Sequence, residues 1–424
     1  GMGTEAVEVK ASYRNSFSTL SVPVLSLFLF LLPHQATAKT PDVQFQQYLT
    51  NICFGTYTVP ATWNLNELAN MCNYAFPGGV AGGVSGPSAL SNVGAANAIS
   101  GPATRKKRGL REREEDQKQK PARGASADDG RWGFLVTPQY GQTSRADTDL
   151  ENGYHSELAG LVAGLDYRFS DSFVLGGTIG RTKDNAAFVN NAGSLKTGSN
   201  TFTLYGTWLA SESTAVDGYL GYGKLSTDSR RYVNFGAISG PITSSTTGRQ
   251  AMAGMSVSYQ KDLGRANLSP FINLDYIKTT FNGYSETGTV VPDPTPASGG
   301  ANMGTSLLAL RYGDRSVISF TSSLGARLGT TYSYDWGTLA PGARLATVHE
   351  FQNKARQLNN ELVLTPGVSM SVATDAADRN YLLSGLGVVA ALNGGAQLFL
   401  DFEKRMQDRL LNTWSLSLGG LVEF

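Results

Sequence analysis

Apolar and polar residues alternate with a period of two along most of the chain from residue 131 onward. In residues 157–169 (ELAGLVAGLDYRF), leucine, alanine and aromatic side chains occupy one face, whereas Asp166 and Arg168 occupy the other. Residues 396–405 (AQLFLDFEKR) repeat this pattern. Because the side chains of a β-strand point alternately to its two faces, the period predicts about twelve strands, each with an apolar face and a polar face.

Short and long links alternate between these predicted strands. The tight turns fall near residues 170–172, 211–213, 262–265, 334–337 and 393–395, and the long polar links near 141–156, 185–198, 228–246, 284–303 and 350–379, with a shorter one near 407–411. Both ends of a soluble sandwich face the same solvent, so a sandwich has no reason to sort its loops by length. Outer-membrane barrels have short periplasmic turns and longer external loops. The links therefore predict an all-β, antiparallel transmembrane β-barrel.

Aromatic residues near the predicted strand ends fit the two girdles of such a barrel. They are Tyr167, Trp208, Tyr276, Tyr381, Phe402 and Trp414. We predict that these side chains face lipid at the two membrane surfaces, and that the polar face of each strand lines the lumen.

Residues 1–38 have the character of a secretory signal peptide. Lys10 and Arg14 precede the apolar run SVPVLSLFLFLL, residues 21–32, which is too short for a transmembrane helix. Small residues, Ala36 and Ala38, come next. We predict cleavage before Lys39; a short membrane anchor is the alternative.

The predicted exported segment, residues 39–103, carries both cysteines, Cys53 and Cys72. Export brings them into an oxidising compartment, so we expect them to form a disulfide. Residues 77–103 are a spacer of glycine, alanine and serine without periodicity. The segment is too small to build a large core of its own.

Residues 104–120 (TRKKRGLREREEDQKQK) are rich in good helix formers and end before Pro121. Two pairs of opposite charges stand four residues apart, Arg111 with Glu115 and Glu114 with Lys118. Taken alone, this pattern is typical of a solvated linker helix.

Composition excludes several classes of function. The 424 residues carry a net charge of only +1, which argues against a nucleic-acid partner. GYLGYGKL, residues 218–225, lacks the Ser or Thr of a phosphate-binding loop, and HEFQN, residues 349–353, lacks the second histidine of a metalloprotease helix. G-x-S-x-G does not occur. We therefore predict no enzyme, no catalytic residue, no metal and no cofactor; a barrel enzyme using His155 or His349 is the alternative.

Three segments resemble the autotransporter β-domain of type V secretion. Residues 269–288 are similar to its Pro-aromatic strand and Gly-Tyr-x-Glu loop, and residues 381–406 with 414–424 are similar to its closing strands. Residues 323–351 resemble its central strand pair, with matching residues at Trp336, Pro341, Arg344, His349 and Glu350. The resemblance covers residues 130–424. It implies a twelve-stranded barrel with an α-helix in the pore and a small N-terminal segment.

The resemblance also assigns roles to particular residues. It makes residues 104–120 a helix that plugs the pore, with Arg111, Glu114, Glu115 and Lys118 facing a charged lumen. The lumen residues implied are Asp275, Arg327, Arg344, Asp401, Glu403 and Arg405. The closing strand resembles the signal read by the outer-membrane assembly machinery, through Trp414, Leu416, Leu418, Val422 and Phe424. We expect this strand to pair with residues 131–140, because closure removes the sheet edge.

The sequence thus predicts an outer-membrane translocator that exports its own short N-terminal segment and displays it at the surface of a Gram-negative cell. The helix at residues 104–120 lacks the Asn-Asn pair at which one branch of the family is cleaved, so we expect segment and barrel to stay joined. The expected partners are outer-membrane lipid and lipopolysaccharide, periplasmic chaperones and the barrel assembly machinery, with the protein itself a monomer. The alternatives are an adhesin, with the head or the loops as its binding surface, and a passive porin-like channel.

Overall fold

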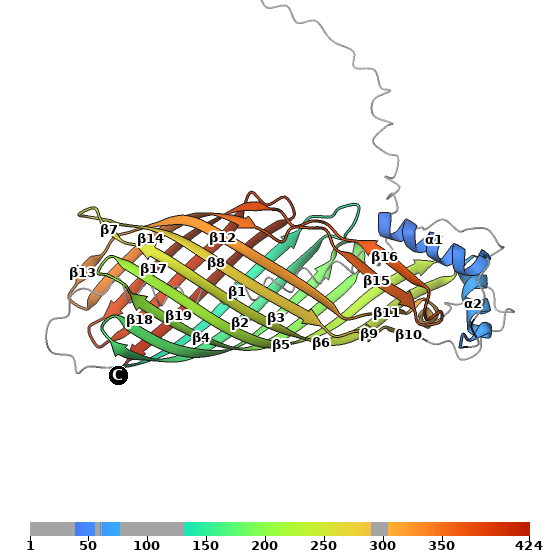
Figure 1. Cartoon of the computed structure of the whole chain (residues 1–424), viewed down its shortest axis with the longest axis horizontal. Coiled ribbons are helices and arrows are strands. Elements are labelled where there is room, and N and C mark those ends of the chain that lie inside the picture. The colour runs from blue at the N-terminus through green and yellow to red at the C-terminus, as the bar shows by residue number, and fades with distance from the viewer. Residues whose placement is uncertain (1–38, 56–59, 61, 77–130, 290–303) are drawn as a thin grey trace, which may run out of the picture. The chain divides into compact units, whose positions relative to one another are not determined.

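The computed structural model describes residues 39–55, 60, 62–76, 131–289 and 304–424 (Figure 1). The predicted signal peptide, most of the glycine-rich spacer and the helix predicted at residues 104–120 lie outside these residues.

A closed antiparallel barrel of twelve strands forms the body of the described chain. Its strands are β1 (Trp132–Arg145), β2 (Tyr154–Ser170), β3 (Phe173–Phe188), β4 (Gly193–Leu209), β5 (Thr214–Phe235), β6 (Ile238–Tyr259), β8 (Asn267–Phe281), β12 (Arg315–Gly329), β14 (Gly337–Glu350), β17 (Asn380–Leu392), β18 (Ala396–Met406) and β19 (Leu411–Glu423). Each strand pairs with its neighbour in this order, and β19 pairs with β1. The predicted fold class is confirmed.

Pairing of β1 with β19 closes the barrel. The register places Gly133 opposite Glu423 and Arg145 opposite Leu411. At the end of the ladder, the Trp132 N–H donates to the Phe424 carbonyl at 3.1 Å, and the Phe424 N–H donates to the Trp132 carbonyl at 3.0 Å. The predicted pairing of the closing strand with residues 131–140 is therefore confirmed. The first and last strands of the barrel therefore have no unpaired edge. This is required in a membrane, where water cannot satisfy unpaired backbone groups.

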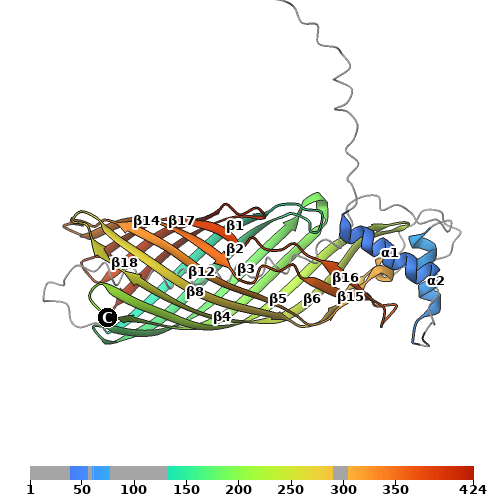
Figure 2. The same ribbon diagram turned by 45° about the horizontal axis from the view of Figure 1, so that its top comes forward.

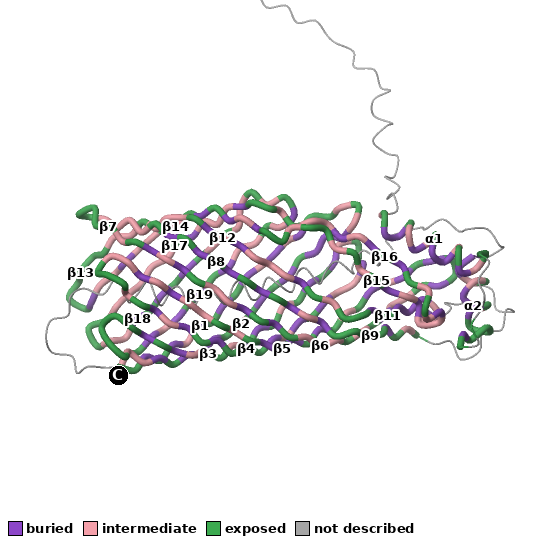
Figure 3. The backbone as a smooth tube through the Cα atoms, viewed as in Figure 1, coloured by how far each residue is buried: buried purple, intermediate pink, exposed green. Residues whose placement is uncertain are grey.

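The outer wall of the barrel is apolar between two aromatic levels, and buried and exposed residues alternate along its strands (Figure 3). At one level Trp132 packs on Tyr167, with ring centroids 4.9 Å apart, and at the other Tyr140 packs on Trp414 at 5.8 Å. Trp132 and Tyr140 both lie on β1. Eight residues separate them, about 26 Å along the strand and roughly 20 Å along the normal of a tilted barrel, which matches a membrane's apolar band.

The predicted place of Tyr381 in the aromatic girdle is wrong. Tyr381 is buried with 8% of its surface exposed, and the guanidinium carbon of Arg405 lies 3.5 Å from its ring centroid. Tyr381 falls on the inward-facing side of β17, so its ring packs under a charged lumen residue instead of meeting lipid.

The two ends of the barrel differ. We call the end with the short turns, where Trp132 and Phe424 meet, the turn end, and the opposite end the outer end. Two helices, α1 (Thr40–Phe54) and α2 (Leu65–Ala75), lie at the outer end, away from the C-terminus (Figures 1 and 2). Among the described residues, no helix has the length and apolar character needed to cross a bilayer.

Several predicted long links are not loops. Residues 228–246 form the far half of the β5–β6 hairpin, which turns only at Gly236 and Ala237. Residues 350–379 contain a further hairpin, β15 (Gln357–Leu362) with β16 (Ser369–Ala373). The prediction failed there because the outward face of a strand turns polar once it leaves the membrane, which hides the alternation.

Smaller elements complete the outer and turn ends. They are β7 (Lys261–Asp262), β9 (Tyr284–Ser285), β10 (Thr287–Gly288), β11 (Leu310–Tyr312), β13 (Tyr332–Tyr334) and the 3-10 helices η4 (Val189–Asn191) and η5 (Thr305–Leu308). A separate sheet in the order β16-β15-β11-β9 stands beyond the barrel wall at the outer end.

Glycines let large inward side chains lie flat against the lumen wall. A Cβ added to Gly419 would come within 2.0 Å of the Phe399 ring, which packs in a small inner cluster with Leu135 and Leu421. The neighbouring Gly420 faces outward, and its nearest atom is a Leu398 methyl carbon at 3.6 Å.

These two glycines make a matched pair for testing the packing. Gly419→Val should displace the Phe399 ring and destabilise the barrel by about 1–3 kcal/mol, the usual cost of overpacking. Gly420→Val should have little effect, since its side chain would enter lipid. The measurement is the temperature at which the SDS-resistant folded form disappears. Equal transition temperatures in the two variants would contradict the packing described here.

Candidate functional site

The two helices at the outer end form a small covalently linked unit, which we call the head (residues 39–76). Pro41 occupies the first turn of α1, where its missing N–H costs nothing. The side chain of Asn64 caps α2 by accepting the Glu67 N–H at 3.3 Å. Cys53, near the end of α1, is disulfide-bonded to Cys72 on α2. The bond therefore fixes the two helices to one another.

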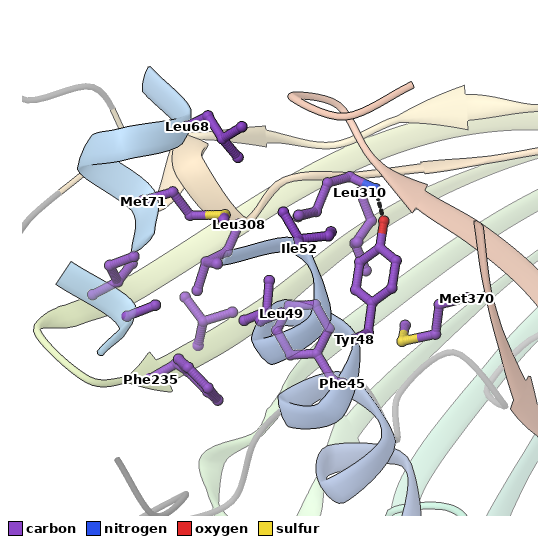
Figure 4. Close-up of a cluster of buried hydrophobic side chains, with 14 of the residues drawn as sticks. Phe45, Tyr48, Leu49, Ile52, Leu68, Met71, Phe235, Leu308, Leu310 and Met370 are labelled. Atoms are coloured by element: carbon purple, nitrogen blue, oxygen red, sulfur yellow. Dashed lines mark hydrogen bonds between the residues drawn. The ribbon is translucent and has the colours of Figure 1, made fainter. Parts of the chain in front are cut away.

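The head has no core apart from the barrel. Its apolar residues form a single buried cluster with the outer hairpins, which we call the capping core (Figure 4). The head contributes Phe45, Tyr48, Leu49, Ile52, Trp63, Leu68, Met71, Ala75 and Phe76; the hairpins and the outer sheet contribute Val233, Phe235, Ile238, Ile242, Leu308, Leu310, Tyr312, Leu362, Met370 and Val372.

Phe235, at the tip of β5, stands at the centre of this contact. Its ring meets that of Phe45 edge-on with centroids 6.0 Å apart, and that of Phe76 edge-on at 5.6 Å. One hairpin side chain thus packs against residues from both ends of the head. Aromatic pairs in this geometry contribute about 0.5–1.5 kcal/mol beyond the area they bury.

Directional hydrogen bonds fix the position of the head on the loops. The Tyr48 hydroxyl donates to the Val368 carbonyl at 2.6 Å and accepts the Leu362 N–H at 3.1 Å. The Trp63 indole N–H donates to the Pro366 carbonyl at 3.2 Å. Because these partners are backbone groups of the β15–β16 hairpin, the contact specifies an orientation as well as burying apolar surface.

A second attachment holds the start of the head. The Lys39 ammonium lies 2.9 Å from an Asp147 carboxylate oxygen and also contacts the Thr148 carbonyl. The Thr40 N–H donates to the Asp149 carbonyl at 3.0 Å. The loop between β1 and β2 therefore binds the first residues of α1.

The same loop contains a buried charge cluster. Arg145 pairs with Glu151 and, at 2.6 Å, with Asp375 from the link after β16. Burial raises the pKa of Glu151 from 4.5 to about 7; Arg145 opposes this shift and Asp375 adds to it. Glu151 is therefore a titrating group in the loop that holds Lys39.

Beneath the capping core, a buried ion pair joins β5 to the loop beyond β8. Arg231 donates to both carboxylate oxygens of Glu286, at 2.6 and 2.5 Å, and to the Leu308 carbonyl at 3.0 Å. Glu286 also accepts the Leu310 N–H at 2.9 Å. Burial acts to lower the pKa of Arg231, but the Glu286 carboxylate reverses this and raises it. The pair positions Leu308 and Leu310 within the capping core.

The predicted lumen residues lie on the inward face of the barrel and fall into three groups. Arg344 forms a bidentate ion pair with Asp401, with nitrogen–oxygen distances of 2.6 and 2.8 Å. One of its guanidinium nitrogens also lies 3.3 Å from a carboxylate oxygen of Glu403. The Arg344 side chain crosses Gly385 to make these contacts, since a Cβ there would lie 2.5 Å from the guanidinium carbon. Arg327 stands directly opposite Arg344 in the strand register.

The other two groups are separate from this cluster. Asp275 accepts a hydrogen bond from the Tyr219 hydroxyl at 2.9 Å. Arg405 lies over Tyr381 and pairs with Asp408. A cavity of about 180 Å³ opens beside the first group and is lined in part by Arg327, Arg344 and Asp401.

The structure does not bring the two histidines of the barrel together. His155 on β2 is hydrogen-bonded to Ser144 at 2.9 Å, and His349 on β14 to Asn380 at 2.7 Å. These strands belong to different walls of the barrel. Within the described ranges, no cluster of three His, Cys, Asp or Glu side chains is arranged to hold a metal.

Sequence reasoning missed the capping core and the Arg231–Glu286 pair. The signal was present in β5, whose inward positions include polar residues such as Asp217 and Thr227 before they become Val233 and Phe235 at the tip. An inward face that changes from polar to apolar beyond the membrane indicates a surface covered by another part of the chain.

A closed barrel with an apolar outer wall, aromatic levels and a charged lumen defines a transmembrane β-barrel of the outer-membrane type. Residues 134–403 match the family model described as the autotransporter beta-domain. The chain belongs to this family and is an outer-membrane protein.

The chain is also similar to several known proteins. Lipase 1 of Photorhabdus luminescens is 28% identical over 309 residues, 72% of this chain and 44% of that protein. Outer membrane protein A of Rickettsia rickettsii is 25% identical over 276 residues, 61% of this chain and 11% of that protein. The chain therefore spans less than half the length of either relative. The translocator domain of the autotransporter NalP from Neisseria meningitidis shares the fold, with a TM-score of 0.56 and 12% identity over 77% of this chain and 98% of that domain.

The raised pKa of Glu151 gives a pH dependence with a definite sign. Folding takes up a proton at Glu151 between pH 4.5 and about 7, so the β1–β2 loop is most stable at the acidic side. Its stability should fall as the pH rises through this window, by up to about 3 kcal/mol, and then level off. Hydrogen exchange of residues 146–153 at pH 5 and pH 8, corrected for intrinsic rates, measures the effect. Glu151→Gln should abolish it; an unchanged pH dependence in this variant would refute the assignment.

Proposed function

We propose that this protein is a translocator that carries its own N-terminal segment through its barrel and holds the head at the cell surface as a cap. One observation supports this most directly. The head packs on the outer end, whereas the barrel that follows it in sequence begins and ends at the turn end. Long hairpins of such barrels face outward from the cell.

The connection between the head and the barrel supports the same proposal. Phe76 belongs to the capping core, and Trp132 is hydrogen-bonded to Phe424 at the turn end. The residues between them therefore connect the two sides of the membrane. They include Arg111, Glu114 and Lys118, whose charges are costly in lipid and tolerable in a polar lumen. The lumen is accordingly the route that we assign to this part of the chain.

The proposed plug follows from the same reasoning. As a helix, residues 104–120 would extend about 25 Å, close to the thickness of the membrane. The lumen wall offers both signs of charge, with Arg327 and Arg344 on neighbouring strands and Asp401 and Glu403 on β18. The plug is thus proposed to be held by ion pairs with these side chains.

We assign no catalytic role to the head. Residues 39–76 contain no histidine and no serine, and both of their cysteines are in the disulfide. The head is proposed to stay joined to the barrel, since its core is shared with the outer hairpins. For insertion, the closing strand with Trp414, Leu416, Leu418, Val422 and Phe424 is proposed as the segment that the barrel assembly machinery reads, after periplasmic chaperones deliver the chain.

An epitope placed after Gly55, between the two helices, tests the display of the head. On intact cells it should bind antibody and be removed by added protease, while a periplasmic marker stays protected. The same epitope after Gly394, in a turn at the other end of the barrel, should be protected until the outer membrane is broken. Protection of the Gly55 epitope would place the head in the periplasm and reject the proposal.

Conductance in planar bilayers distinguishes the plugged translocator from a passive channel. Deleting residues 104–120 should raise the single-channel conductance several-fold, because it removes a helix about 10 Å wide from the lumen. Deleting a stretch of equal length within residues 77–103 serves as the control and should leave the conductance low. High conductance in the undeleted protein would favour the channel.

A further inference from the structure

Four basic side chains mark the outer edge of the apolar wall on one side of the barrel. On β3, the exposed Ile179 is followed on the same face by Arg181, and on β5 Tyr222 is followed by Lys224. On β6 and β8 the same boundary is marked by Arg249 and Lys278. In each strand the base is the first charged outward residue beyond the apolar band. We call Arg181, Lys224, Arg249 and Lys278 the outer basic patch.

Strand register brings these residues together. Lys224 stands directly opposite Arg249, which places their Cβ atoms about 4.5–5.5 Å apart. Lys278 is opposite Ala251 and so is the diagonal neighbour of Arg249, at about 7–8 Å. Asn200 is opposite both Arg181 and Lys224, which separates these two bases by about 10 Å. Long side chains span these distances, so all the ammonium and guanidinium groups can reach one or two shared anions.

The arrangement is unfavourable without such anions. All four side chains are exposed, and within the described part of the chain none of them has a carboxylate partner. Like charges directly opposite in a sheet are destabilising. The nearest outward carboxylate along β5, Asp228, is about 13 Å farther along the strand, where it faces Lys196 and accepts a hydrogen bond from Ser245 at 2.6 Å. Glu157 on β2, beyond the patch, is contacted by Gln142 at 3.4 Å.

The position of the patch identifies the missing anion. At the turn end the same strands present uncharged outward residues at the edge of the apolar band, such as Phe173, Val216 and Tyr259. Beyond Tyr259 at that end, Lys261 is a single base followed directly by Asp262. The clustered positive charge of these strands therefore lies at the outer end. In an outer membrane the leaflet at that end is built of lipopolysaccharide, whose lipid A carries phosphates at the boundary between acyl chains and water. We propose that the outer basic patch binds the phosphate groups of lipid A, through charge-assisted hydrogen bonds from Lys224 and Arg249 flanked by Arg181 and Lys278.

A control residue lies on the opposite wall. Lys404 on β18 is likewise the first charged outward residue beyond the apolar Phe402. Its register partners, Ser384 and Trp414, carry no charge. β18 is six strands away from β5 around the barrel. Lys404 therefore shares the depth and chemistry of the patch but not its clustering.

The test uses the purified full-length protein in detergent. Lipid A with both phosphates, and the same lipid without them, are titrated into wild type, the Lys224→Gln/Arg249→Gln double variant and Lys404→Gln, with native mass spectrometry as the readout. The double variant should bind the bisphosphorylated lipid roughly 10- to 30-fold more weakly, since each base at an anionic surface contributes several-fold. Lys404→Gln should match wild type. The charge-retaining swap Lys224→Arg/Arg249→Lys should also bind as wild type does.

Thermal unfolding provides a second readout that a merely damaged barrel would not reproduce. Without lipid, the double variant should be as heat-resistant as wild type or more so, because a like-charge contact is gone; with bisphosphorylated lipid A, only wild type and the swap should gain resistance. Equal binding of the phosphate-free lipid would overturn the proposal. So would wild-type affinity in the double variant, or displacement of lipid A by equimolar inorganic phosphate or phosphatidylglycerol, which would indicate general attraction of anions.

Discussion

Closure of the barrel between β1 and β19 is the contact on which the other features of this protein depend. In hydrocarbon an unpaired backbone group costs several kcal/mol, so the strands are stable only when the last one pairs with the first. The mutual hydrogen bonds of Trp132 and Phe424 complete that pairing at the turn end. Closure also fixes both termini of the barrel on one side of the membrane. The head precedes β1 in sequence and packs at the other end, so the depth of the barrel separates it from the start of β1.

The inward-facing residues of the same strands differ in polarity inside and outside the membrane. Within the bilayer, the large inward residues of β5, Asp217 and Tyr219, are polar because they face a lumen with charged groups such as Asp275. Beyond it, inward positions become apolar, and Phe235 packs between residues from both ends of the head. The buried Arg231–Glu286 pair lies at this change of environment. Removing one partner of such a pair typically costs about 3–5 kcal/mol, so the pair acts as a rigid base for the capping core.

Periodicity in the sequence was sufficient for the barrel and insufficient for its cap. Two-residue alternation and the contrast of link lengths predict the strands and the closure, since both follow from local rules of strand geometry and membrane thickness. Tyr381 was misassigned because strand ends do not reveal which face an isolated aromatic side chain occupies. The polarity of residues 228–246 predicts a loop, because their outward residues are solvated. Their inward residues pack against a head about 160 positions earlier in the chain. A contact between residues so far apart in the chain leaves no pattern in the local sequence.

Size explains why the cap forms only where it does. Helices of 15 and 11 residues are marginal in water by themselves, and the disulfide limits their unfolded states without supplying a core. Their apolar residues form a core only together with the outer hairpins, which also supply the backbone partners of Tyr48 and Trp63. On the periplasmic side none of these surfaces is available, because that end of the barrel has short turns. In the proposed translocation, the free energy of docking is therefore released only after the head has crossed, and it opposes the head's return.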